Sequence, residues 1–243
     1  MASNKNIQDP DLRLQSARQF AETALGPAIS LSPLTQDASF RRYFRIRRGA
    51  ESWMLMDAPP DRENTKAYVT VDRHLERLSF CVPKILAQDE TGGYLLLEDF
   101  GDQTFTRLLD SGEDAQPLYG RAVETLARLN RHADAMQVDV PHYSLNELLR
   151  EAGLLVEWFH RLCHNKPAPG AVHEEYLSIW TGLIESQPAP AMSLTLRDFH
   201  VDNLMLVHRG ASIECGLLDF QDAVIGPMAY DLMSLLQDAR RDL

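Results

Sequence analysis

The chain is poor in several features that would point to other kinds of protein. It has three cysteines, an odd number without the short spacings of a metal site, so we expect a reducing compartment and no disulfide framework. No apolar run approaches the roughly 18 residues of a membrane helix, and the N-terminus is polar without an apolar signal core. These absences favour a soluble, cytoplasmic protein.

Basic residues are also scarce. Lys and Arg number 24 against 35 Asp and Glu, which gives a formal net charge of -11 and a pI of about 5.1. This balance argues against nucleic acid and against an anionic membrane as partners. With 243 residues and 44% hydrophobic content, the chain can form one large domain or two lobes around a substantial core.

The first hundred residues mix helical and strand periodicity. Helical spacing covers 12–25 and 63–79, whereas strand patterns cover 40–48, 53–56 and 93–97. We expect a small, mainly antiparallel sheet that carries one helix and has another in front of it.

From about Phe105 the composition becomes helical. Apolar stripes at helical spacing, which we interpret as core faces, cover 119–132, 145–162 and 176–184. Short strands then follow at 193–196, 204–207 and 213–218. We place the lobe boundary near residues 99–104, so that residues 1–100 form a sheet lobe and 103–243 a helical lobe.

The sequence Leu-Arg-Asp-Phe-His-Val-Asp-Asn, which ends at Asn203, is the candidate catalytic motif, together with Asp219, which follows the strand pattern at 213–218. In phosphoryl transfer from ATP, one Asp accepts or orients the proton of the attacking hydroxyl, while an Asn and a second Asp hold Mg²⁺. Asp198 fits the first role. Asn203 and Asp219 offer the hard oxygen ligands that Mg²⁺ prefers. The alternative is an Asn- and Asp-rich turn, which the spacing and flanking strands disfavour.

Neighbouring residues support this loop. Arg197 is a second catalytic candidate, which either contacts a phosphate or braces the loop, and His200 is expected to support the loop. Asp231 opens an apolar helical segment, so we expect it to cap a helix or brace the loop.

An Asp-Phe-Gly sequence at residues 99–101 matches the metal motif of kinases, but we interpret it differently. It lies far before the loop of Asp198, whereas the metal-binding Asp must follow that loop. The apolar strand before it and the helical pattern after it suit a hinge at residues 98–102. Backbone groups near Glu98 and Phe100 are our candidates for binding adenine there.

The strings LRDFHVDNLM and GLLDFQDAVIGPMAYDLMSLLQDARRD resemble the aminoglycoside phosphotransferase-like kinase superfamily. DASFRRYFRI, MDAPP and LLLEDFGD resemble its branch of bacterial N-acetylmuramate/N-acetylglucosamine anomeric kinases of cell-wall recycling. The resemblance implies an α+β, two-lobed, protein-kinase-like fold with ATP and Mg²⁺ between the lobes. It also implies an amino sugar whose anomeric hydroxyl accepts the phosphoryl group.

The resemblance assigns roles by position. Asp198 corresponds to the catalytic Asp, and Asn203 and Asp219 to the metal ligands. The loop at 37–43 corresponds to the segment that covers the phosphates, and its nucleotide-binding candidates are Ser39, Phe40, Arg41 and Arg42.

Two departures from the family pattern stand out. Met56 occupies the place of the strand lysine that contacts the α- and β-phosphates. Five arginines lie within residues 41–48, so Arg41 or Arg42 is a hypothetical replacement, because Arg binds phosphate bidentately. The alternative, a solvated edge strand, stays open. Family members also continue past the equivalent of Leu243 with helices that wall the acceptor site, so we expect a shortened chain with uncovered apolar faces.

Two competing interpretations remain open. The same chemistry could act on an aminoglycoside, a choline-like molecule or another metabolite. A nucleotide-binding pseudokinase is favoured by Met56 and the short C-terminus, and opposed by the complete set of Asp198, Asn203 and Asp219.

Overall fold

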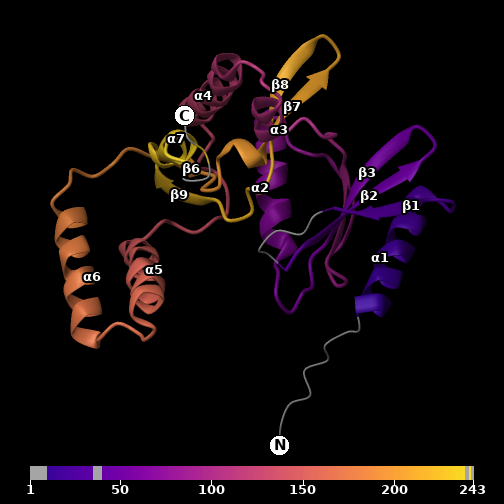
Figure 1. Cartoon of the computed structure of the whole chain (residues 1–243). Coiled ribbons are helices and arrows are strands. Elements are labelled where there is room, and N and C mark those ends of the chain that lie inside the picture. The colour runs from indigo at the N-terminus through magenta and orange to yellow at the C-terminus, as the bar shows by residue number, and fades with distance from the viewer. Residues whose placement is uncertain (1–9, 35–39, 239–240, 242–243) are drawn as a thin grey trace, which may run out of the picture.

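The computed structural model describes residues 10–34, 40–238 and 241. Its N-terminal part is built on a five-stranded antiparallel sheet with strand order β1-β2-β3-β5-β4 (Figure 1). The strands are β1 (Ser30–Pro33), β2 (Arg42–Arg48), β3 (Glu51–Asp57), β4 (Ile85–Asp89) and β5 (Tyr94–Glu98). The expected antiparallel sheet is therefore present, with β1 and β4 added at its two edges.

Two helices cover opposite faces of this sheet, α1 (Pro10–Leu25) and α2 (Thr65–Arg77). Successive residues of a strand point to opposite faces. Leu55 accordingly packs in a cluster with Ala17 and Ala21 of α1, whereas Met56 packs with Val71 of α2. The cluster that contains Met56 and Val71 also includes residues of the helical part of the chain, so the α2 face of the sheet packs against that part.

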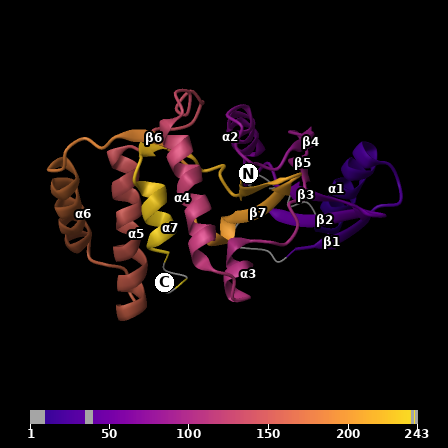
Figure 2. The same cartoon turned by 90° about the horizontal axis from the view of Figure 1, so that it is seen from above.

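The second part of the chain is mainly helical. Its helices are α3 (Phe105–Asp110), α4 (Ala115–Arg131), α5 (Leu145–His164), α6 (Gly170–Glu185) and α7 (Tyr230–Leu236). Between them lie two small antiparallel strand pairs, β6 (Met192–Thr195) with β9 (Val224–Pro227), and β7 (Leu204–Arg209) with β8 (Ser212–Leu217). Figure 2 shows α4, α5, α6 and α7 grouped on the side away from the large sheet. The α+β class, with a sheet part followed by a helical part, agrees with the sequence.

The apolar stripe of α4 is a core face, as predicted. Ala122, Leu126 and Leu129 are buried in the cluster that also holds Leu75 of α2 and Leu194 of β6. This helix therefore joins the helical part to the strands that carry the motif.

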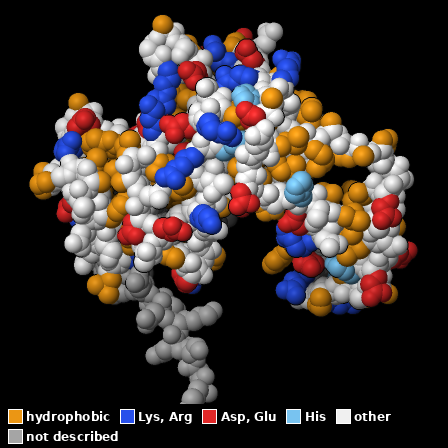
Figure 3. Space-filling model, turned by 180° about the vertical axis from the view of Figure 1, so that it is seen from behind, with side chains coloured by type: hydrophobic (Ala, Val, Ile, Leu, Met, Phe, Trp, Pro, Cys, Tyr) orange, Lys and Arg blue, Asp and Glu red, His pale blue; other side chains and the backbone are white. Residues whose placement is uncertain are grey.

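The same prediction is wrong for α5 and α6. Leu155, Phe159, Ile179 and Leu183 are each more than half exposed. Within the described residues, the two helices form an arm that contacts chiefly itself, and Figure 3 shows apolar side chains on the surface of this arm. Periodicity indicates which face of a helix is apolar, but it does not indicate what covers that face.

No helix among the described residues is long and apolar enough to cross a lipid bilayer.

Candidate functional site

The predicted catalytic loop connects β6 to β7 and is anchored by apolar residues. Leu196 and Phe199 are buried in the main core, whereas Asp198 between them is only half-buried. A one-turn 3-10 helix at Val201–Asn203 then leads into β7. The alternation of buried and half-buried residues presents the Asp198 carboxylate at the surface of a rigid support.

Asp231 at the start of α7 holds the beginning of this loop. Its carboxylate accepts hydrogen bonds from the backbone N–H groups of Leu196 at 2.7 Å and Arg197 at 2.8 Å. Arg197 has a φ of 72°, in the left-handed region that non-glycine residues rarely adopt. The loop-bracing role predicted for Asp231 is confirmed by these contacts.

Asn203 is tied to the loop through its side-chain nitrogen. That nitrogen donates to the carbonyl oxygen of Asp198 at 3.0 Å and lies 3.3 Å from the Nε2 atom of buried His200. The Asn203 carbonyl in turn accepts from the backbone N–H of Leu218 at 3.0 Å. This last bond joins the catalytic loop to the segment that carries Asp219, and His200 supports the loop as expected.

Asp219 lies two residues after the end of β8 and also has a left-handed backbone, with a φ of 56°. The next residue, Phe220, is fully buried, and its ring centroid lies 5.0 Å from that of Tyr68 in α2. Asp219 Oδ1 accepts hydrogen bonds from Gln221 Nε2 at 3.1 Å and pairs with Arg41 Nη2 at 2.9 Å. The side chain of Asp219 thus meets a residue of the sheet part.

The site has an excess of negative charge. Burial raises the pKa of Asp198, and the carboxylates of Asp219 and Asp222 raise it further, while His200 and Arg197 act in the opposite direction. A cation in this region would therefore relieve repulsion among the carboxylates.

The donor set suits Mg²⁺ bound together with phosphates. Among the described residues, no group of three or more His, Cys, Asp and Glu side chains forms a metal site by itself. Mg²⁺ is usually held by one or two carboxylates together with substrate phosphates, rather than by an all-protein cage. The carboxylate of Asp219 and the amide oxygen of Asn203 meet that requirement.

The structure separates the two arginines that were equal candidates for phosphate binding. Arg41 lies at Asp219, whereas Arg42 Nε donates to Asp57 Oδ2 at 2.9 Å. Asp57 is fully buried and also pairs with Arg13 of α1 at 2.6 Å, so Arg42 belongs to the opposite face of the sheet.

The other candidates in the predicted phosphate loop are less defined. Ser39 lies outside the described residues. Phe40 is 54% exposed, and its backbone N–H donates to Glu63 Oε1 at 3.1 Å. This contact of Glu63 was not predicted from the sequence, because the helical spacing at 63–79 does not indicate which residues lie against its first side chain.

Arg197 points toward α5 rather than toward Asp219. Its Nη2 lies 2.6 Å from Glu151 Oε1, and its guanidinium sits 5.5 Å from the ring centroid of Tyr143. These contacts suit the bracing role that was one of its two predicted alternatives.

The linker at residues 98–102 is held from both parts of the chain. Glu98 Oε2 accepts from Arg209 Nη2 at 2.7 Å, and Phe100 packs so closely on Gly216 that a Cβ there would lie 2.9 Å from its ring. Arg45 of β2 pairs with buried Asp99 at 2.8 Å. Arg209 is the last residue of β7, and its contact with the linker was not predicted from the sequence.

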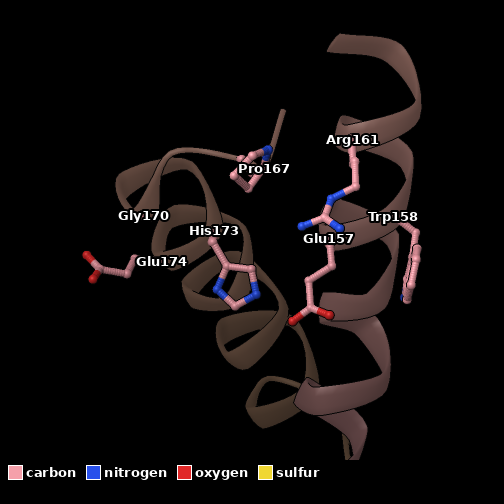
Figure 4. Close-up of a pocket in the computed structure, with 8 residues that line it drawn as sticks. Glu157, Trp158, Arg161, Pro167, Gly170, His173 and Glu174 are labelled. Carbon is pink, nitrogen blue, oxygen red and sulfur yellow. The ribbon is translucent and has the colours of Figure 1, made fainter. Parts of the chain in front are cut away.

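A cavity of about 410 Å³ lies elsewhere, between α5 and α6. In Figure 4, Glu157 and Arg161 of α5 and His173 of α6 face it, whereas Trp158 points away from α6. None of its lining residues is a predicted site residue, so the cavity and the catalytic loop are separate features.

Comparison with known proteins gives the family. Residues 30–243 match the model of the phosphotransferase enzyme family. An N-acetylmuramate/N-acetylglucosamine kinase of Pseudomonas putida is 36% identical over 222 residues, which are 90% of this chain and 63% of that protein. A protein of the same name from Caulobacter vibrioides is 30% identical over 270 residues, with 95% and 74% covered. The chain thus spans about three fifths of the length of the Pseudomonas relative.

Solved structures of low identity share the fold. Choline kinase LicA from Streptococcus pneumoniae superposes with a TM-score of 0.65 at 12% identity, covering 94% of this chain and 76% of that one. The GDP complex of aminoglycoside 2'-phosphotransferase-IIIa gives 0.61 at 18% identity, covering 93% and 78%. These similarities confirm the predicted protein-kinase-like fold, and the match over residues 30–243 shows that the chain belongs to the phosphotransferase enzyme family.

Proposed function

We propose that the protein is an ATP- and Mg²⁺-dependent kinase that phosphorylates the anomeric hydroxyl of N-acetylmuramate or N-acetylglucosamine during peptidoglycan recycling in the cytoplasm. The observation that carries this proposal is the catalytic loop, in which Asp198 and Asn203 are hydrogen-bonded together and tied to the Asp219 segment. The names of the relatives with 30–36% identity support the amino sugar as acceptor.

Asp198 acts on the acceptor hydroxyl in this proposal. It orients the hydroxyl and takes its proton while the new bond forms between the sugar oxygen and the γ-phosphorus. The bond between that phosphorus and the bridging oxygen breaks, and the leaving group departs as ADP. Because burial and neighbouring carboxylates raise the pKa of Asp198, its charged form accepts a proton more readily than an exposed Asp does.

The metal and the nucleotide are held by the remaining residues. Asn203 and Asp219 would hold Mg²⁺, which would neutralise charge on the phosphate oxygens. The backbone of the linker near Glu98 and Phe100 binds adenine, and Ser39 and Phe40 belong to the segment that covers the phosphates. We accordingly place the lobe boundary near residues 99–104, between β5 and α3.

Arg197 is a positioning residue in this proposal. Its ion pair with Glu151 connects the catalytic loop to α5 at the residue that precedes Asp198. This contact makes the orientation of the loop depend on the first helix of the α5–α6 arm.

An ADP-release assay with a panel of acceptors tests the proposed function. The panel contains N-acetylmuramate, N-acetylglucosamine, aminoglycosides and choline, and Asp198→Asn serves as the control. We expect ADP release with the two amino sugars and its loss in the variant. Release with only an aminoglycoside or choline would assign another acceptor, and nucleotide binding without release under any condition would support the pseudokinase interpretation.

A further inference from the structure

The carboxylates at the site create a charge problem for a polyphosphate ligand. The carboxylates of Asp219 and Asp222 already repel that of Asp198, and a nucleotide adds the negative charge of its phosphates. Such ligands are normally met by a cation that hydrogen-bonds to phosphate oxygens.

Lysine does not fill this role in the described part of the chain. Met56 in β3, at the place expected for a phosphate-binding lysine, is 1% exposed and packs in the core. The described lysines are all exposed to solvent and lie outside the five strands of the sheet: Lys66, Lys84 and Lys166. The phosphate-binding cation near the site is therefore expected to be an arginine.

Strand alternation divides the arginines around β2 between the two faces of the sheet. Arg42 and Arg48 point to the α1 face. There, Arg42 pairs with buried Asp57, and Arg48 pairs with Glu51 at 3.0 Å and sits over the ring of Trp53. Neither guanidinium is directed at Asp219.

The residues on the other face are Arg41, Arg45 and Arg47. Arg45 contacts the linker, where it pairs with Asp99 at 2.8 Å and donates to the carbonyl of Gly101 at 2.8 Å. Arg47 lies near the far end of the strand and is exposed. Arg41 alone among these arginines has a recorded contact with a predicted metal ligand.

Arg41 is also placed as a phosphate-binding group should be. Arg41 is 8% exposed. Its Nη2 lies 2.9 Å from Asp219 Oδ1, and its Nε lies 3.8 Å from Glu63 Oε2. It immediately follows Phe40, in the segment between β1 and β2 that is expected to cover the phosphates. The Arg41 guanidinium contacts Asp219. Phosphates bound to a metal at that carboxylate would therefore lie within reach of the same guanidinium.

Resting on the proposed function, we propose that Arg41 is the phosphate-contacting cation of this protein and that it exchanges partners when the nucleotide binds. Before binding, Arg41 neutralises Asp219. When Asp219 takes part in holding the metal, the guanidinium passes to the phosphate oxygens. Each negative group then keeps an opposite charge in both states, which avoids leaving a half-buried carboxylate without a counter-ion.

This exchange makes a prediction that a purely structural ion pair does not make. In Arg41→Met, the affinity for ATP in the presence of Mg²⁺ should fall by about ten- to a hundredfold, the loss typical of a hydrogen-bonded charged group. The affinity for Mn²⁺ alone should rise, on the order of tenfold, because the competing guanidinium has left Asp219. The two affinities therefore move in opposite directions.

Titration calorimetry for ATP with Mg²⁺, and water-proton relaxation for Mn²⁺ alone, measure the two affinities. Arg47→Met is the matched control, since it removes the same charge from the same face of the sheet, and both of its affinities should equal those of the wild type. Arg41→Lys retains the charge without the fork of donors, so its ATP affinity should be intermediate.

The outcomes separate this inference from the function on which it rests. If the wild type binds ATP and Arg41→Met binds it equally well, the role of Arg41 is wrong while the proposed function stands. If both affinities of Arg41→Met fall together, or Arg41→Lys behaves like Arg47→Met, the exchange is likewise wrong. If the wild type binds no nucleotide, both proposals fail. Should Arg41→Met not fold, the wild-type Arg41 Nε resonance, assigned through Arg41→Lys, must shift on addition of ATP with Mg²⁺.

Discussion

The carboxylate of Asp231 holds the backbone of Arg197 in a left-handed conformation, through a hydrogen bond of 2.8 Å to its N–H. The same carboxylate accepts from Leu196 at 2.7 Å, and burial raises its pKa to about 6. A buried acceptor at the start of α7 thus stabilises the strained residue beside Asp198. Strain of this kind persists only where the surrounding contacts enforce it.

Asp231→Ala should lower both stability and turnover. The buried N–H of Leu196 would lose its acceptor, at about 1–3 kcal/mol, the half-buried N–H of Arg197 would lose its acceptor too, and Arg197 would be released from its conformation. We expect a lower unfolding free energy in urea and a larger loss in kcat than in ATP affinity. Ser234→Ala is the comparison, because its hydroxyl donates to the Arg197 carbonyl at 3.2 Å from the same helix and should cost less. Equal effects of the two substitutions would contradict the bracing role.

Arg42→Met should weaken the fold without affecting the nucleotide. Asp57 is fully buried and would retain only Arg13 as its counter-ion, so we expect a loss of about 1–3 kcal/mol in unfolding free energy. Chemical denaturation measures the loss, and ATP titration should give the wild-type affinity. A variant of normal stability with weakened ATP binding would show that Arg42, too, acts at the phosphates.

Asp72 of α2 should make stability depend on pH. It is fully buried, and its carboxylate oxygens have no hydrogen-bond partner among the described residues. Burial and then the charge of Glu76 raise its pKa to about 7, while Arg73 acts in the opposite direction. In the unfolded chain an Asp loses its proton near pH 4. Between about pH 4 and 7 the folded protein therefore holds a proton that the unfolded chain has released, and stability falls as the pH rises through this window.

Asp72→Asn removes this dependence. The variant should be more stable than the wild type at pH 8, by up to about 4 kcal/mol, and similar to it at pH 4. Urea unfolding at both values of pH gives the comparison. Parallel pH profiles for the two proteins would show that Asp72 does not titrate in this range.

The catalytic loop could be predicted from the sequence because its function depends on short-range spacing. Asp198 and Asn203 are five positions apart and are hydrogen-bonded within one loop, and Asp219 follows the strand pattern predicted at 213–218. Chain order alone also argues against Asp99 as a metal ligand, because Asp99 precedes the catalytic loop whereas the metal-binding Asp must follow it. The positions of residues within one short loop can therefore be predicted almost entirely from the sequence.

The partners of the arginines could not be predicted in this way. Alternation shows that Arg41 and Arg42 face opposite sides of β2, but only the packing of α1 against one face decides which side holds Asp219. The apolar stripes of α5 and α6 were misjudged for a related reason, since a stripe predicts an apolar face and not its cover. Long-range contacts, rather than local propensity, set these features.

The central claim is that the protein transfers the γ-phosphoryl group of ATP to the anomeric oxygen of an amino sugar. Phosphorus-31 NMR of the products, with N-acetylmuramate, ATP and Mg²⁺, tests it most directly, because coupling to the anomeric proton identifies the esterified oxygen. We predict a sugar 1-phosphate signal that grows with ADP and is absent with Asp198→Asn. A phosphate ester at another hydroxyl, or ATP consumption that yields only inorganic phosphate, would contradict the claim.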